Sequence, residues 1–149
     1  AGAKALALRT PMTQAIAFDK VGDGVELGAF SVKQADGRGL LSLSSLDGAP
    51  LKDSKRQLLI LASDARNSGM RFRDADQRVI EDFGHLPVLI RRMEVGLRFE
   101  TPGTFKISPV GLDGRVRAPV ATAKSGNIVR LSNDTPGGPT TYFLVERTE

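Results

Sequence analysis

The sequence predicts an all-β protein, namely an antiparallel β-sandwich of the jelly-roll or immunoglobulin-like kind that forms a single domain over residues 1–149. Short stretches that alternate apolar and polar residues recur along the chain, as half-buried strands do. Turn residues, including many of the 16 Gly and 8 Pro, separate these stretches at short intervals. No stretch shows a convincing amphipathic helical period, and 149 residues suffice for a sizeable core.

About ten to twelve short strands follow from this pattern, a number typical of a sandwich. Pro11 follows the first strand and favours an edge position for it, because Pro is tolerated at sheet edges. Asp47-Gly48 favours positive φ and predicts a hairpin or a corner. The expected strands are 4–9, 13–18, 25–32, 40–46, 56–65, 70–73, 88–92, 95–99, 104–108, 110–116, 127–131 and 140–146.

The most hydrophobic stretch, 56–65, is expected to be a central strand. A buried helix is the alternative, because a short apolar run does not distinguish the two by its period. The turn residues that follow, including Asn67 and Gly69, favour the strand.

Composition excludes several classes of function. The net charge of +4 arises from 21 basic and 17 acidic residues scattered along the chain, which favours a mixed soluble surface over a nucleic-acid partner. Cys is absent, so disulfides, thiol nucleophiles and Cys-bound metals are excluded. No segment is long and apolar enough to predict a membrane partner, and residues 1–4 lack a signal-peptide core. We therefore expect a mature, trimmed or excised chain.

Several segments together resemble a known bacterial module, with the Ser-Leu-Asp-Gly-x-Pro-Leu motif at 45–51 as the most specific part. The segments are 10–15, 25–28, 45–59, 65–70 and 83–90. In the last segment Phe83 stands where the module has Trp. The module lies C-terminal to the TIM-barrel catalytic domain of putative glycoside hydrolases of the cellulase and β-galactosidase type.

This resemblance implies an accessory β-sandwich in a secreted or periplasmic polysaccharide-degrading enzyme. Its implied partners are a polysaccharide or oligosaccharide and the catalytic TIM-barrel domain. The family's catalytic carboxylates lie on the barrel, so no catalytic residue is assigned here and the chain alone is not expected to be an enzyme.

Carbohydrate sites commonly use flat aromatic side chains together with polar groups that bind the hydroxyls. Trp is absent, Tyr occurs once, and most of the 7 Phe occupy alternating strand positions expected in the core. The sequence therefore favours a polar cleft over a flat platform. The candidate ligand-binding residues are Asn67, Arg71, Phe72, Phe83, His85 and Arg91.

Two groups of titratable residues have both a functional and a structural interpretation. His85, the only histidine, could act as a base or ligand, but beside Gly84 and Pro87 it is more typical of a loop residue with one hydrogen bond. An acidic cluster could hold calcium, which is bound by several oxygen ligands. Neighbouring Arg residues favour a solvated loop instead. The cluster comprises Asp74, Asp76, Glu81 and Asp82.

The sequence favours carbohydrate binding as the role of such a module, with packing on the catalytic barrel as the alternative. It could bind polysaccharide and raise the enzyme's concentration at its substrate. Alternatively, it could pack on the catalytic barrel and stabilise it, in which case an exposed apolar surface is expected. A free-standing enzyme is the third class, and it would require two facing carboxylates that no spacing in the chain enforces.

Overall fold

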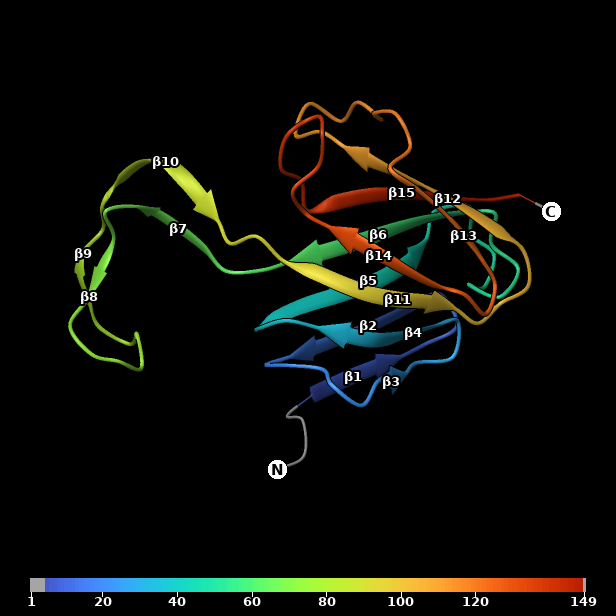
Figure 1. Cartoon of the computed structure of the whole chain (residues 1–149), viewed down its shortest axis with the longest axis horizontal. Coiled ribbons are helices and arrows are strands. Elements are labelled where there is room, and N and C mark those ends of the chain that lie inside the picture. Colours follow the sequence, from blue (N-terminus) through green and yellow to red (C-terminus); the bar gives the residue numbers. More distant parts are fainter. Residues whose placement is uncertain (1–4, 149) are drawn as a thin grey trace.

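The computed structural model describes residues 5–148, and within this range every regular element is a β-strand (Figure 1). Residues 5–148 contain no helix with the length and hydropathy that a membrane crossing requires. The strands in the first half of the chain are β1 (Ala5–Arg9), β2 (Thr13–Phe18), β3 (Val25–Glu26), β4 (Phe30–Ala35), β5 (Gly39–Ser45), β6 (Arg56–Ala62) and β7 (Ala65–Ser68). The remaining strands are β8 (Arg71–Phe72), β9 (Ile80–Asp82), β10 (His85–Ile90), β11 (Glu94–Phe99), β12 (Thr104–Val110), β13 (Ala121–Lys124), β14 (Ile128–Ser132) and β15 (Tyr142–Thr148).

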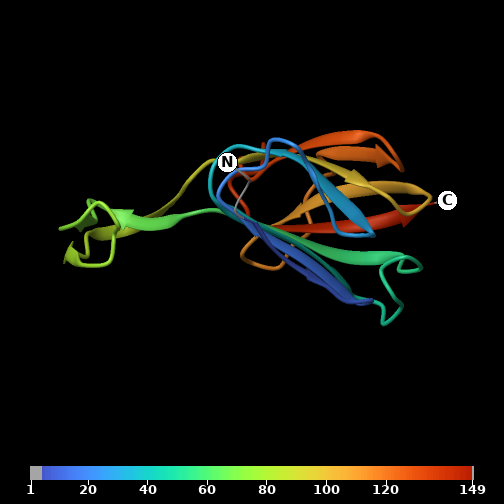
Figure 2. The same ribbon diagram turned by 90° about the horizontal axis from the view of Figure 1, so that it is seen from below.

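Two antiparallel sheets form the body of the molecule, and they face each other as two layers (Figure 2). The larger sheet has seven strands in the order β1-β2-β5-β6-β15-β12-β13. The smaller sheet has four strands in the order β14-β11-β4-β3. The predicted fold class, an all-β antiparallel sandwich, is therefore confirmed.

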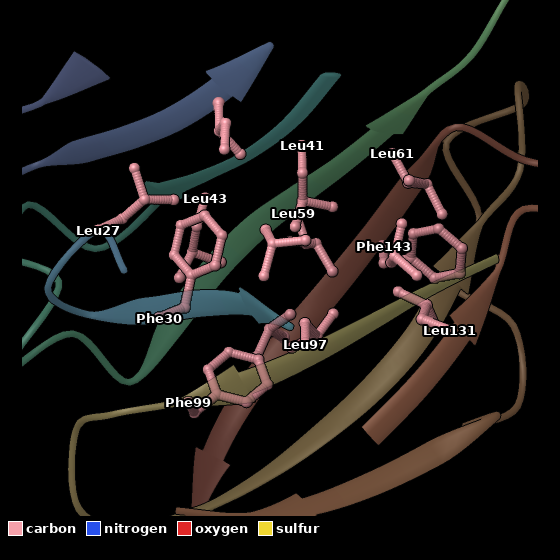
Figure 3. Packing of buried hydrophobic residues seen from close by; sticks show 14 of the residues in the cluster. Leu27, Phe30, Leu41, Leu43, Leu59, Leu61, Leu97, Phe99, Leu131 and Phe143 are labelled. Atoms are coloured by element: carbon pink, nitrogen blue, oxygen red, sulfur yellow. The ribbon is translucent and has the colours of Figure 1, made fainter. Parts of the chain in front are cut away.

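The core lies between the two sheets and is built from alternate residues of each strand. Because successive side chains point to opposite faces of a sheet, one residue in two faces the core. On β6, for example, Leu59 and Leu61 are fully buried, and they pack near Phe143 of β15. Phe99 and Phe105 stack with ring centroids 4.1 Å apart. Figure 3 shows residues from both layers meeting in this cluster.

The long connection between β5 and β6 is organised by Asp47. Gly48 has φ of +79°, as the Asp-Gly pair predicts. One carboxylate oxygen of Asp47 accepts hydrogen bonds from the amides of Lys55 and Arg56, at 2.7 and 3.2 Å. The hydroxyls of Ser54 and Ser45 and the amides of Lys55 and Ala49 lower the pKa of Asp47 well below its ordinary value and outweigh desolvation, which raises it. Asp47 therefore joins both ends of the connection.

Two sequence-based alternatives are resolved by the sheet order. Residues 56–62 form a strand and not a helix, and β6 is the middle strand of the larger sheet. The strand before Pro11, β1, lies at the edge of that sheet as predicted. Lys4, the first residue of the expected strand 4–9, lies outside the described residues.

A slender arm, residues 64–91, projects from one end of the sandwich (Figures 1 and 2). It contains two small antiparallel ribbons, β7 with β10 and β8 with β9. The sequence predicted an irregular connection over 79–87, where the structure has β9 and the start of β10. Arg91 fixes the root of the arm: its carbonyl oxygen accepts hydrogen bonds from Ser63 Oγ (2.5 Å) and Asn133 Nδ2 (2.9 Å).

Candidate functional site

All six predicted ligand-binding residues lie on the arm, although they are up to 24 positions apart in the sequence. Asn67 is on β7, Phe72 and Arg71 are on β8, and His85 begins β10. Phe83 lies between β9 and β10, and Arg91 lies at the root. The arm therefore carries all six residues, and their role in ligand binding stays a prediction.

The shape of the arm depends on a close approach between its outgoing segment, at 67–68, and its returning segment, at 83–84. Gly84 has φ of +67°, and a Cβ atom there would lie 2.3 Å from the carbonyl oxygen of Ser68. Only glycine fits this position without a backbone shift. Asn67 Nδ2 donates to the carbonyl oxygen of Phe83 at 2.9 Å, which ties the same two sides together. Near the tip, the Arg66 guanidinium lies 5.2 Å from the centre of the Phe72 ring, within cation–π range.

A hollow of about 460 Å³ lies on the inner half of the arm. Its lining combines the apolar side chains of Leu89 and Ile90 with polar groups. Those polar groups include the amide of Asn67, the carboxylate of Asp64 and the guanidinium groups of Arg66 and Arg91. Such a mixture fits a small polar ligand with an apolar face. Among the lining residues only Asp64 carries a carboxylate, so the hollow lacks the facing pair that glycoside hydrolysis requires.

The hollow brings together two of the six predicted residues, Asn67 and Arg91, and leaves four outside. Arg71 forms an exposed ion pair with Asp82, at 3.4 Å. His85 Nδ1 lies 2.8 Å from the carbonyl oxygen of Leu86, the single local hydrogen bond expected of a loop histidine. Phe83 is 69% exposed and does not line the hollow.

The four predicted calcium ligands lie toward the tip of the arm, and three of them are bonded to protein groups. Asp76 pairs with Arg78 at 3.8 Å, and Asp74 accepts a hydrogen bond from the amide of Arg78 at 2.8 Å. Asp82 pairs with Arg71 and accepts from the amide of Gly84, while Glu81 is exposed on β9. Over residues 5–148, no three His, Cys, Asp or Glu side chains are grouped so that they could hold a metal ion.

The outer face of the seven-stranded sheet forms a second candidate surface, which we call the apolar face. Its members are two neighbouring rows of outward residues that cross β1, β2, β5, β6 and β15, since residues paired in antiparallel register share a face. Further along the same side of β6 and β15 lie Arg56 and Glu146, and Glu146 pairs with Lys106 at 2.9 Å. One row runs through Leu6, Ala17, Leu40 and Ala62, and the next through Leu8, Ala15, Ser42, Ile60 and Tyr142. Leu6 and Leu8, at the sheet edge, are 78% and 53% exposed. Neither row contains a charged residue.

The outer face of the four-stranded sheet carries charged side chains, and we call it the charged face. Lys33 pairs with Glu26 at 3.4 Å, and Arg130 pairs with Glu94 at 3.6 Å. Glu100 accepts hydrogen bonds from Ser31 Oγ (2.6 Å) and Arg98 Nε (2.8 Å). Burial raises the pKa of Glu100, but the Ser31 and Arg98 hydrogen bonds and the Arg98 and Lys33 charges together lower it below 4.5.

The sequence analysis missed the apolar face. The sequence contains a signal for this face, because residues 58–62 and 15–18 are continuous apolar runs. In a strand that exposes one face to solvent, apolar and polar residues alternate instead. The run at 58–62 was interpreted only as evidence for a central strand. Continuous runs of this kind are typical of strands that are covered on both faces.

No protein-family model, curated protein or solved structure matches the chain.

Proposed function

We propose that this chain is a noncatalytic accessory β-sandwich of a polysaccharide-degrading glycoside hydrolase, and that it docks on the catalytic TIM barrel through its apolar face. The resemblance of segments 10–15, 45–59 and 65–70 to such modules supports the family, and with it a secreted or periplasmic enzyme. The apolar face is the observation that carries the docking role.

The physical argument rests on how apolar surface behaves in water. A contiguous apolar surface exposed on a soluble protein commonly marks an interaction site. The apolar face spans five adjacent strands, and its two rows lack charge, while the charged face of the same body is laced with ion pairs. A barrel packed on the apolar face would remove Leu6, Leu8 and Leu40 from water and leave the charged face solvated.

The experiment that tests docking is titration calorimetry of this chain with the catalytic barrel encoded in the same reading frame. We expect the wild-type chain to bind and to raise the thermal midpoint of the barrel. The double variant L8E/L40E should weaken binding at least tenfold, because it would bury two unpaired charges. The matched control, Ile128→Glu on the charged face, should bind as the wild type does.

Three outcomes contradict the proposal. They are the absence of a barrel-encoding stretch in the reading frame, the absence of binding by the wild-type chain, and equal loss of binding in Ile128→Glu.

A second role, carbohydrate binding, is favoured by the hollow on the arm. There Asn67 and Arg91 could bind sugar hydroxyls while Leu89 and Ile90 contact an apolar ring face. Affinity electrophoresis against a panel of soluble glycans tests this role. We expect retardation by one glycan, reduced in Asn67→Ala and Arg91→Ala and retained in Arg92→Ala, an exposed neighbour outside the hollow. No retardation by any glycan would remove this role and leave the docking proposal standing.

A further inference from the structure

The arm carries more exposed apolar surface than its own strands can cover. All six residues of β10 are exposed, and Leu86 reaches 78%. The ribbon of β7 and β10 pairs with no strand of either sheet. An isolated two-stranded ribbon is marginal in water, because it has no third layer to bury its side chains. The arm therefore exposes apolar side chains of the kind that protein interfaces bury.

The exposed area is close to what a stable dimer needs. The large apolar residues of the arm are 38–78% exposed, which corresponds to roughly 650 Å² per chain. Neighbouring residues of a strand point to opposite sides, so a flat contact would cover about half of this surface. Two arms that wrap around each other would bury up to about 1,300 Å² in total, within the range of specific interfaces. These residues are Val79, Ile80, Phe83, Leu86, Val88, Leu89 and Ile90.

The charges of the arm favour a second copy of the chain. The whole chain has a net charge of +4, so two copies repel each other through most of their surface. Residues 64–91 hold as many acidic as basic residues, and the arm is therefore neutral. The acidic residues are Asp64, Asp74, Asp76, Glu81 and Asp82, and the basic ones are Arg66, Arg71, Arg73, Arg78 and Arg91. A surface of mixed charge can meet itself about a two-fold axis without net repulsion.

We propose that two copies of this chain form a symmetric dimer in which the arms pack against each other through the apolar side chains of 79–90. Pro87 has no amide N–H and interrupts the free edge of β10, so the contact is between side chains and not a continuous strand ladder. The arms hold the two positively charged bodies apart. This inference does not rest on the proposed enzyme family.

Sedimentation velocity of the full chain over a range of micromolar concentrations tests the dimer. We expect wild type to approach twice the 16.0 kDa mass of one chain as concentration rises. The double variant F83S/L86S should raise the dimer dissociation constant at least ~100-fold, because it removes two central apolar anchors. Both positions are exposed, so circular dichroism should stay unchanged, and so should the thermal midpoint at concentrations where the wild type is monomeric.

Two matched variants make the outcome decisive. L112S removes a leucine that is 91% exposed but lies off the arm, and it should dimerise as the wild type does. L6S/L8S alters the apolar face and should also leave the dimer intact. A wild-type chain that stays monomeric at every concentration overturns the proposal. A dimer that persists in F83S/L86S also overturns it. So does a dimer that L6S/L8S or L112S weakens as much as F83S/L86S does.

The hollow provides an independent check, because Leu89 and Ile90 belong both to its lining and to the proposed dimer contact. Packing of a second arm over these residues closes the hollow to other ligands. A glycan that occupies the hollow should therefore shift the chain toward monomer, and glycan binding there with the dimer fully retained would contradict arm pairing through Leu89 and Ile90.

Discussion

The outer faces of the two sheets differ in chemistry, although their inner faces share one core. On the four-stranded sheet the outward positions carry ion pairs such as Lys33 with Glu26, which water solvates. On the seven-stranded sheet two neighbouring rows of outward positions across five adjacent strands are aliphatic, small or aromatic, as in the row from Leu6 to Ala62, and the charged residues Arg56 and Glu146 lie further along β6 and β15. Core formation explains the inner residues of both sheets. It does not explain why two rows of outward residues on one sheet are apolar, whereas docking on a partner, as proposed above, would.

The largest expected change in the free energy of unfolding distinguishes substitutions on the inner side of β6 from those on its outer side. Leu59→Ala leaves a cavity in the core and should lower the free energy of unfolding by about 2–5 kcal/mol. Ile60→Ala, one residue further on the apolar face, should cost less than about 1 kcal/mol in the isolated chain. Urea denaturation measures both. A large loss from Ile60→Ala would mean that the apolar face already has a cover within the chain.

A smaller change in the free energy of unfolding, dependent on pH, is expected for a substitution on the charged face. The pKa of Glu100 is lowered on folding, so its contribution to stability is complete above its ordinary value of 4.5 and is lost as the pH falls through the folded value. Glu100→Gln should therefore lower the free energy of unfolding by about 1 kcal/mol at pH 7 and have little effect near pH 3. Denaturation at a series of pH values measures this difference.

The matched control for that series is Glu94→Gln, which removes only an exposed ion pair with Arg130. Its effect should be a few tenths of a kcal/mol. Equal losses from the two variants at pH 7 would show that the Ser31 and Arg98 hydrogen bonds to Glu100 contribute nothing beyond surface charge.

The smallest effect concerns the accessibility of the apolar face itself. The dye ANS binds exposed apolar surface, and its fluorescence with the folded chain should fall in part in L8S/L40S. The arm retains its own apolar residues, so the fall should be incomplete. Ile128→Ser, on the charged face, should leave the signal unchanged, and an equal fall there would mean that the two faces do not differ in this respect.

The fold class and most strands could be predicted because alternation and turn residues are local signals. The pairing β6-β15, which joins residues more than eighty positions apart, has no such signal, since it depends on which apolar strands fill the core together. The arm was missed for a related reason. Strands were expected at 70–73 and 88–92, but Ile80–Asp82 is too short to show a period, and the pairing of the arm's strands depends on the contact at Gly84.

The ligand-binding role of the candidate residues stays a prediction, and the structure shows where they lie. Loop-prone polar and aromatic residues from 67 to 91 were selected for their exposure, and the structure places all of them on one projecting element. Their division between the hollow and the rest of the arm follows from the ribbon's register, for example Ile90 opposite Ala65. Sequence spacing does not encode that register. The apolar face could have been inferred from the continuous run at 58–62.

The two ends of the arm belong to different layers of the sandwich. β7 follows directly from β6 of the seven-stranded sheet, and β10 leads directly into β11 of the four-stranded sheet (Figure 1). Tension applied at the tip is therefore divided between both layers and runs along their strands, where many hydrogen bonds would have to break at once. A partner that pulled on the arm would therefore move both sheets together, and it would not separate a single strand from its neighbours.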